Sequence, residues 1–133
     1  MTNSLSLTHG IWCVDVGNLP NYGYEHILKM LSKSDRPEGL VCFNDNCAYQ
    51  AMAAANELGI RIPEELSLIG FGDIMLSSIM CPKLTTVKQF PEDIGSKAAD
   101  ILLESIKRRD EPYVPQSILM PEELICRDSV RRQ

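Results

Sequence analysis

Two uninterrupted apolar runs of strand length, residues 39–43 and 66–71, constrain the fold of this chain more than any other feature. Runs without polar alternation are typical of strands that are covered on both faces of a parallel sheet. Each run ends in a polar loop, Asn44-Asp45 after the first and Gly72-Asp73 after the second. Ligands of open parallel sheets bind at the carboxyl ends of the strands, so we expect the chain to meet a ligand at these loops.

Length and composition restrict the classes to which the chain can belong. Its 133 residues suffice for one domain with a real core, and 44% hydrophobic with 23% charged residues is typical of a soluble globular protein. The net charge of −5 disfavours direct nucleic-acid binding by this chain. The sequence has neither a membrane-spanning apolar run nor an export signal at its start, so we expect a cytoplasmic protein with no membrane partner.

Strand and helix patterns alternate along the chain, which predicts a doubly wound α/β unit with a parallel sheet. Predicted strands lie at 10–16, 39–43, 66–71, 84–88, 116–120 and 123–126, and predicted helices at about 24–31, 44–58, 74–80 and 91–109. The last helix begins at Pro91, with acids in its first turn and bases in its last, as the helix dipole favours. One stripe of this helix is apolar: Ile94, Ala98, Ile101, Leu102 and Ile106.

The chain offers no convincing catalytic constellation, and we expect no catalytic residue, cofactor or metal. His9 and His26 have no nucleophile elbow to partner them, and no glycine-rich phosphate loop is present. The five cysteines are typical of reduced core residues. Cys42 and Cys47 bracket a polar loop, but without a Cys-x-x-Cys pair or a nearby histidine they do not predict a metal site.

What remains is a set of neutral and anionic hydrogen-bonding groups at predicted strand ends: Asn18, Asn44, Asp45, Asp73 and Gln89. Such groups suit a polyhydroxylated or amide-bearing small molecule, because each exchanges several directional hydrogen bonds. Helix capping explains Asn44 and Asp45 equally well, and it explains Asp73 somewhat better than ligand binding does. Both roles stay open for these residues.

An ordered series of motifs resembles the LacI/GalR family of bacterial transcription regulators. The motifs are Pro-Glu-Gly-Leu-Val-Cys-Phe-Asn-Asp at 37–45, the segment 57–71 ending in Leu-Ile-Gly-Phe, Pro-Lys-Leu-Thr-Thr-Val-Lys-Gln at 82–89, Ile-Gly-x-x-Ala at 94–98, and Pro-Glu-Glu-Leu-Ile-Cys-Arg-Asp-Ser at 121–129. The resemblance covers about residues 22–130.

The resemblance implies a periplasmic-binding-protein-like effector domain of two lobes, joined in whole members of the family to a helix-turn-helix head that binds operator DNA as a dimer. This chain then corresponds to the C-terminal lobe at 10–88, a crossover helix and strand at 89–120 that normally belong to the other lobe, and a tail at 121–133. The implied partners are a sugar-like effector, a second copy of the chain, and operator DNA only through a head absent here.

Site residues follow from the resemblance by position. Asn44 and Asp45 match the family's Asn-Asp pair at the effector cleft, Gln89 matches the crossover residue near it, and Asn18 lies where a pocket-wall residue is expected. Gly72 replaces the acid that usually meets the effector, which leaves Asp73 as the remaining carboxylate and puts sugar recognition in question.

The resemblance also suggests a dimer surface that contains Tyr49, Ile79 and Met80, whereas we expect Met52 to be a core residue. The apolar stripe of the helix at 91–109 lacks its usual partner lobe, so we predict self-association, with this C-terminal arm swapped between chains as one form. The alternatives are a fragment of a transport-type periplasmic sugar-binding protein, disfavoured because an export signal is missing, and a small α/β enzyme.

Overall fold

The computed structural model describes residues 22–109, 112 and 114–131. The predicted strand at 10–16 and the candidate residue Asn18 lie outside the described residues.

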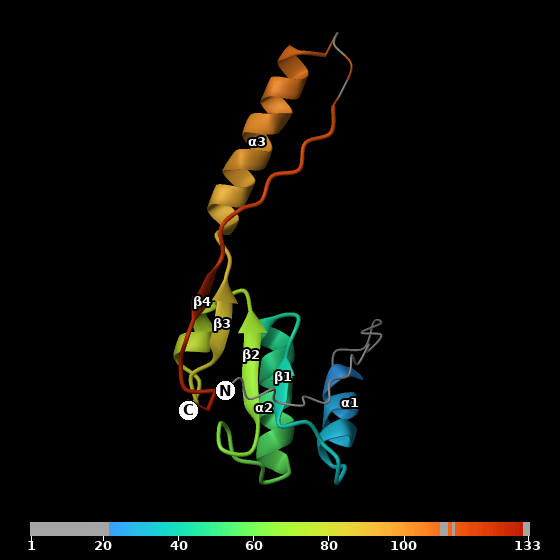
Figure 1. Cartoon of the computed structure of the whole chain (residues 1–133), viewed down its shortest axis with the longest axis vertical. Coiled ribbons are helices and arrows are strands. Elements are labelled where there is room, and N and C mark those ends of the chain that lie inside the picture. The colour runs from blue at the N-terminus through green and yellow to red at the C-terminus, as the bar shows by residue number, and fades with distance from the viewer. Residues whose placement is uncertain (1–21, 110–111, 113, 132–133) are drawn as a thin grey trace, which may run out of the picture.

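The four described strands form one sheet whose order follows the chain (Figure 1). Strands β1 (Gly39–Val41), β2 (Ser67–Phe71) and β3 (Thr85–Lys88) run parallel, and β4 (Glu123–Ile125) pairs antiparallel with β3. The parallel pairing confirms the predicted α/β class. It also places the carboxyl ends of β1, β2 and β3 on one edge of the sheet, so the polar loops that follow them share that edge.

Helices α1 (Tyr22–Leu31) and α2 (Asp45–Glu57) begin and end close to their predicted bounds. α2 packs on β2 and α1 packs beside α2. Four alanines of α2, Ala48, Ala51, Ala54 and Ala55, are fully buried, and their small side chains let the helix lie close to the sheet. α2 ends where Gly59 takes a left-handed conformation, φ +69°, which a glycine adopts without strain.

The core lies between α1, α2 and one face of the sheet. Its largest apolar members are Ile27, Leu31, Met52, Leu66, Leu68 and Leu84. Met52 is 6% exposed, which confirms its predicted place in the core. On the opposite face, Val41 at the end of β1 and Phe43 just after it are 82% and 68% exposed.

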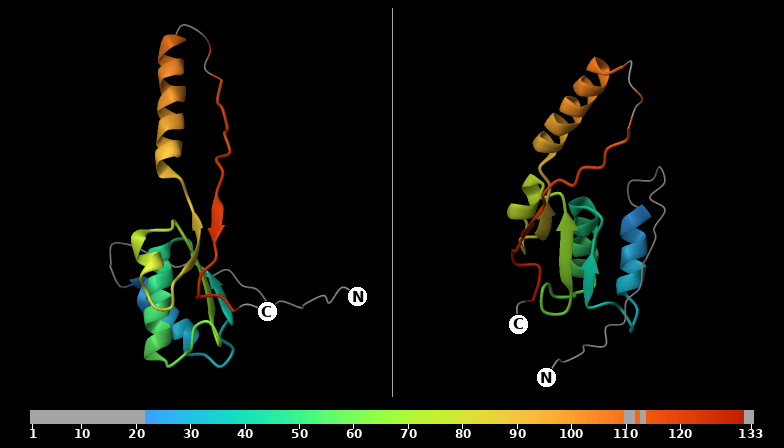
Figure 2. Two further views of the ribbon diagram at one scale, coloured as in Figure 1. Left: turned by 90° about the vertical axis from the view of Figure 1, so that its left-hand side faces the viewer. Right: turned by 45° about the horizontal axis from the view of Figure 1, so that its top comes forward.

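Helix α3 (Pro91–Lys107) extends away from the sheet as an arm (Figures 1 and 2). None of its residues is buried, and Leu102 and Ile106 on its apolar stripe are 61% and 57% exposed. The stripe is therefore present as predicted. Within the described part of the chain, only the returning segment lies beside it, where Val114 and Gln116 border a hollow with the half-buried Ile101.

Two sequence predictions about elements are wrong. Residues 116–120 form no strand, because a strand needs the backbone of a neighbouring strand, and among the described residues this segment runs beside helix α3 instead (Figure 1). The helix predicted at 74–80 is a single 3₁₀ turn, Met75–Ser78, since the run before Pro82 is too short for a stable α-helix.

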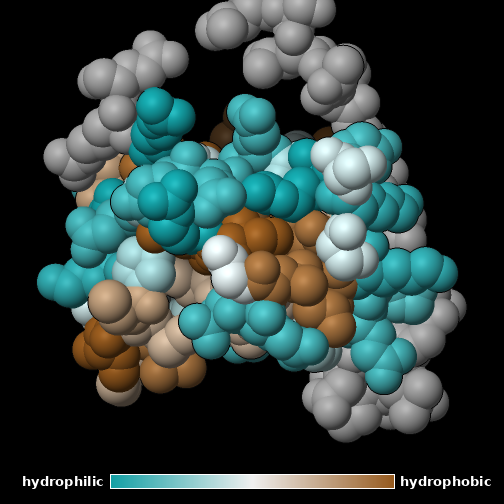
Figure 3. Space-filling model, turned by 90° about the horizontal axis from the view of Figure 1, so that it is seen from below, coloured by the Kyte–Doolittle hydropathy of each residue, from teal (hydrophilic) through white to brown (hydrophobic). Residues whose placement is uncertain are grey.

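Seen from the end opposite the arm, the surface is mostly hydrophilic with an apolar patch at its centre (Figure 3). None of the helices in the described ranges combines the length and apolar character needed to span a bilayer.

Candidate functional site

The buried carboxylate of Asp45 holds together the polar edge of the sheet. Asp45 opens α2 and is 1% exposed. Its Oδ1 accepts a hydrogen bond from Thr86 Oγ1 at 2.6 Å, and its Oδ2 accepts from Ser77 Oγ at 2.7 Å and from the Ile74 backbone N–H at 2.9 Å. These bonds tie α2 to β3 and to the 3₁₀ turn, so Asp45 fixes the relative positions of three elements.

Gly70 makes room for this carboxylate. A Cβ atom at Gly70 would overlap Asp45 Oδ1 and lie 2.8 Å from Leu84 Cδ2. The space that the two side chains occupy therefore excludes any larger residue at this position in β2.

Asn44 caps α2 through its side-chain oxygen. Its backbone is extended, with φ −156° and ψ 171°, and its Oδ1 accepts from the Cys47 backbone N–H at 2.8 Å. The predicted capping role is confirmed. The side chain is half-buried, and its amide NH₂ group has no partner among the described residues, so a ligand could accept its hydrogen bonds.

Asp73 is engaged by the C-terminal tail. Its Oδ1 accepts from Arg127 Nη2 at 2.5 Å, while Arg127 Nη1 donates to the Leu84 carbonyl at 2.8 Å. The Asp73 and Arg127 side chains are only 14% and 16% exposed. The capping interpretation of Asp73 is wrong, because Ile74 occupies the N-cap of the 3₁₀ turn and no side chain caps it. The left-handed conformation of Asp73, φ 49°, turns the chain at this point.

Gln89 follows β3 and is half-buried where the chain leaves the sheet for α3. Beside it, Lys88 Nζ lies 5.3 Å from the centre of the Phe90 ring, a cation–π distance. Asn44, Asp45, Asp73 and Gln89 thus all follow or adjoin the carboxyl ends of parallel strands, while Asn18 is not described.

Sequence reasoning missed Thr86, Ser77 and Arg127 as members of this polar edge. Thr86 was interpreted only as a β-branched strand residue, yet it is fully buried and its hydroxyl bonds to Asp45. The Arg-Asp-Ser motif at 127–129 was the sequence feature that could have indicated a role for the C-terminal tail. Its Ser129 is also fully buried, donates to the Leu68 carbonyl and accepts from the Thr85 backbone N–H.

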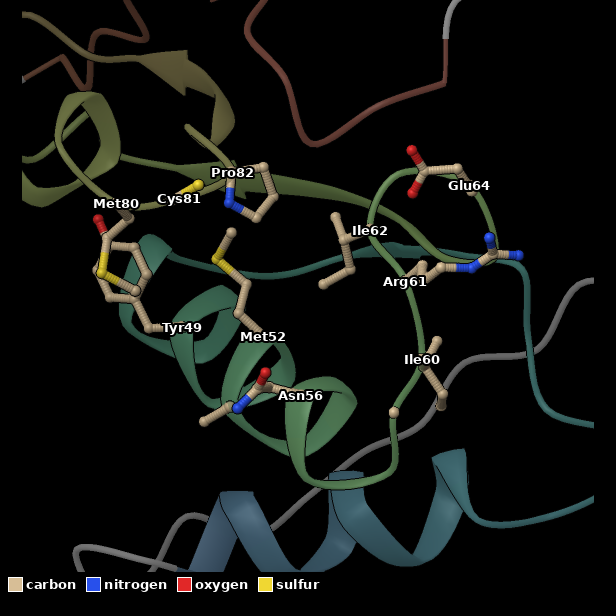
Figure 4. Close-up of a pocket in the computed structure, with 12 residues that line it drawn as sticks. Tyr49, Met52, Asn56, Ile60, Arg61, Ile62, Glu64, Met80, Cys81 and Pro82 are labelled. Carbon is tan, nitrogen blue, oxygen red and sulfur yellow. The ribbon is translucent and has the colours of Figure 1, made fainter.

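A groove of about 630 Å³ lies away from this edge, between α2, the loop that follows it and the segment around Pro82 (Figure 4). Tyr49 and Met80 line one end of it, with Met52 and Asn56 further along α2. Tyr49 Oη lies 3.0 Å from Ser77 Oγ, and desolvation raises the pKa of the Tyr49 hydroxyl. Two of the predicted dimer residues therefore border a groove, and the third, Ile79, is 66% exposed beside them.

Within the described ranges, no group of three or more His, Cys, Asp and Glu side chains could hold a metal ion.

Residues 12–130 match the family of periplasmic binding protein-like domains. The chain is 39% identical over 121 residues to the HTH-type transcriptional repressor PurR of Haemophilus influenzae strain PittEE, covering 90% of this chain and 36% of the repressor. It thus spans about a third of the length of that relative.

Solved structures of regulators have the same fold. The lac repressor dimer bound to operator and the anti-inducer ONPF superposes with a TM-score of 0.73 at 30% identity, covering 83% of this chain and 37% of that one. A LacI family transcriptional regulator from Enterococcus faecium, with bound ribose, superposes with a TM-score of 0.69 at 27% identity, covering 83% of this chain and 40% of the other.

Proposed function

Because the chain belongs to the family of periplasmic binding protein-like domains, and within it to the LacI/GalR regulators, we propose that it senses a sugar or a related metabolite for a transcription regulator. The observation that carries this proposal is the shared edge of β1, β2 and β3, where polar side chains follow three parallel strands. The ribose bound to the E. faecium regulator supports a sugar-like effector.

Two residues contact the effector in this proposal. The amide NH₂ group of Asn44 and the side chain of Gln89 supply hydrogen bonds to hydroxyl or amide groups. Asn18 is a further candidate from its place in the sequence and lies outside the described residues. Asp45 acts indirectly: with its three hydrogen bonds inside the protein and 1% exposure, it positions the edge. Asp73 contributes less than its sequence position predicts, because Arg127 engages its carboxylate.

Residues 10–88 form the C-terminal lobe in this proposal, residues 89–120 cross to the other lobe, and residues 121–133 return as a tail. Arg127 and Ser129 form hydrogen bonds with β2, with Leu84 and β3, and with Asp73. These bonds support the division, since they fasten the tail back onto the lobe.

The chain dimerises through the surface that holds Tyr49, Ile79 and Met80. The groove beside Tyr49 and Met80 and the exposure of Ile79 support this surface, and the lac repressor relative is a dimer. The α3 arm adds a second contact: its apolar stripe packs on the other lobe or, in copies without that lobe, on a swapped arm of a second chain.

The intact regulator is a cytoplasmic protein without catalytic activity, and it meets operator DNA through a helix-turn-helix head. Effector binding between the lobes favours one lobe orientation, and its differential affinity for the two orientations changes the affinity for operator. A transport-type binding protein is less well supported, because the similar proteins are repressors.

The test uses the protein encoded by the whole gene. Its operator is selected from genomic fragments by mobility shift, and sugars and nucleobases are then screened for one that changes the shift. A small molecule that alters operator affinity by about tenfold or more, within the usual 1–3 kcal/mol of allosteric coupling, is the expected result. A gene product that begins with an export signal and binds no DNA would refute the proposal.

A further inference from the structure

Cys42 and Cys47 lie on either side of the Asn44-Asp45 loop and belong to neighbouring elements. Cys42 directly follows β1, where its backbone N–H donates to the Ile69 carbonyl at 2.8 Å. Cys47 lies in the first turn of α2, where its N–H donates to the capping Asn44 side chain. Neither cysteine forms a disulfide in the structure.

The Cys42 and Cys47 side chains meet at one core cluster, with Cys42 inside it and Cys47 packed against it, and the two thiols interact through a side-chain hydrogen bond. Cys42 is 7% exposed within the core cluster, and Cys47 packs against that cluster while remaining partly open to solvent. The hydrogen bond from the Cys42 thiol lowers the pKa of Cys47 to about 7, against the smaller opposing effect of burial. The same contact raises the pKa of the Cys42 thiol, with burial acting in the same direction.

The asymmetry gives each cysteine a separate chemical role. A partly exposed thiolate in the first turn of a helix is a reactive nucleophile, because the N-terminal dipole and the donated hydrogen bond stabilise its charge. A buried thiol in contact with it is shielded from oxidants and placed to react with the first product. The other described cysteines, Cys81 and Cys126, are exposed and have no such neighbour.

We propose that Cys42 and Cys47 form a peroxide-sensitive dithiol that closes into an intramolecular disulfide. The Cys47 thiolate attacks hydrogen peroxide, forming an S–O bond while the O–O bond breaks, and the departing hydroxide takes a proton to become water. The Cys47 sulfenic acid is then attacked by the Cys42 sulfur, which forms the S–S bond, breaks the S–O bond and releases a second water that carries the Cys42 proton. Sulfur is oxidised and the peroxide oxygens are reduced.

The disulfide ring encloses Asn44 and Asp45, the residues that cap α2 and hold the polar edge together. A disulfide requires an S–S distance of about 2.05 Å, shorter than any hydrogen bond between two thiols, so closing the ring draws the two side chains together. Oxidation therefore constrains the loop that holds Asn44 and Asp45 at the edge of the sheet. The proposal concerns these thiols alone and does not depend on the identity of any effector.

The experiment treats the folded full chain with graded hydrogen peroxide, quenches with acid, labels free thiols with N-ethylmaleimide and maps the tryptic peptides by mass spectrometry. No Lys or Arg lies between Cys42 and Cys47, so both stay on one peptide. The expected result is a peptide that loses both labels together, with no disulfide-linked chains on a non-reducing gel, at peroxide doses that leave Cys81 and Cys126 labelled. A reductant should restore both labels.

Variants separate the two roles. Cys47→Ser should abolish the oxidation of Cys42, whereas Cys42→Ser should stop the reaction at a sulfenic acid that dimedone traps at position 47. Cys81→Ser is the matched control and should oxidise as the original chain does. Circular dichroism of each variant before treatment verifies the fold, and comparison of Cys47 with Cys81 labelling rates in the original chain needs no variant at all.

Three results would overturn the proposal. They are oxidation of Cys81 or Cys126 before the pair, conversion of Cys47 to sulfinic acid without loss of the Cys42 thiol, and a disulfide at the pair in Cys81→Ser but not in the original chain.

Discussion

Removing the Asp45 carboxylate tests the buried hydrogen-bond cluster that joins α2, β3 and the 3₁₀ turn. In Asp45→Ala, the Ile74 N–H and the Ser77 and Thr86 hydroxyls lose their acceptor in a site that is 1% exposed. A buried donor left unsatisfied costs about 1–3 kcal/mol. The Ser77 hydroxyl can turn toward the Tyr49 hydroxyl, 3.0 Å away, so its contribution to the lost stability lies at the low end of that range. We expect a total loss of about 3–5 kcal/mol.

Asp45→Asn keeps the shape of the side chain, so it should lose less stability than Asp45→Ala. Its carbonyl can keep the two bonds that Asp45 Oδ2 accepts, and its NH₂ group can donate to the Thr86 hydroxyl once that hydroxyl turns. We expect a loss of about 1 kcal/mol. Asp100→Ala on the exposed α3 arm is the control and should change stability by less than about 0.5 kcal/mol.

Urea unfolding followed by circular dichroism measures these losses. With a slope of about 1.5 kcal/mol per M, the midpoint should fall by about 2–3 M for Asp45→Ala and by less than about 1 M for Asp45→Asn. If Asp45→Ala unfolds within about 0.5 kcal/mol of the original chain, the cluster does not stabilise the fold and the reasoning is refuted. An Asp45→Asn variant as unstable as Asp45→Ala would show that charge, and not hydrogen-bond geometry, carries the effect.

Four further outcomes follow from the same contacts. Gly70→Ala should destabilise the chain by about 1–3 kcal/mol in urea unfolding, because the added methyl group overlaps a buried carboxylate; an unchanged midpoint would contradict the close packing. Arg127→Ala should lower the unfolding free energy by about 2–3 kcal/mol through loss of the pair with Asp73, and Arg127→Lys should recover only part of it. In sedimentation velocity the chain should self-associate and Leu102→Glu should weaken that association, so a monodisperse monomer would exclude the arm as a contact. Iodoacetamide labelling of Cys47 should reach half its maximal rate near pH 7, since its thiolate forms above a pKa of about 7; a midpoint near the ordinary thiol value of about 8.5 would contradict the hydrogen bond from its neighbour.

The local elements could be predicted from the sequence because their signals are local. The apolar runs at 39–43 and 66–71 became β1 and β2, the helical alanine spacing became α2, and Pro91 with its apolar stripe became α3. Asn44 was predicted as a cap from its type and place, and it caps.

The polar cluster could not be predicted, because it depends on residues that only the fold brings together. Asp45 and Thr86 are 41 positions apart in sequence and meet because α2 packs over β2, whose neighbour in the sheet is β3. Arg127 reaches Asp73 across 54 positions for the same kind of reason, since β4 runs back along β3. The strand predicted at 116–120 failed for the converse reason: its local pattern was suitable, but pairing requires a neighbouring strand, and the described sheet supplies none there.

Effector affinity of the whole gene product, measured by calorimetry for one pair of matched variants, tests the central claim most directly. Asn44→Ser keeps an oxygen that can cap α2 and removes the amide NH₂ group, while Asn56→Ser changes the same residue type near the other end of the same helix. The account predicts about tenfold weaker binding for Asn44→Ser, the effect of losing about 1.4 kcal/mol of hydrogen bonding, and unchanged binding for Asn56→Ser. Equal affinities for the two variants would contradict the placement of the effector at this edge of the sheet.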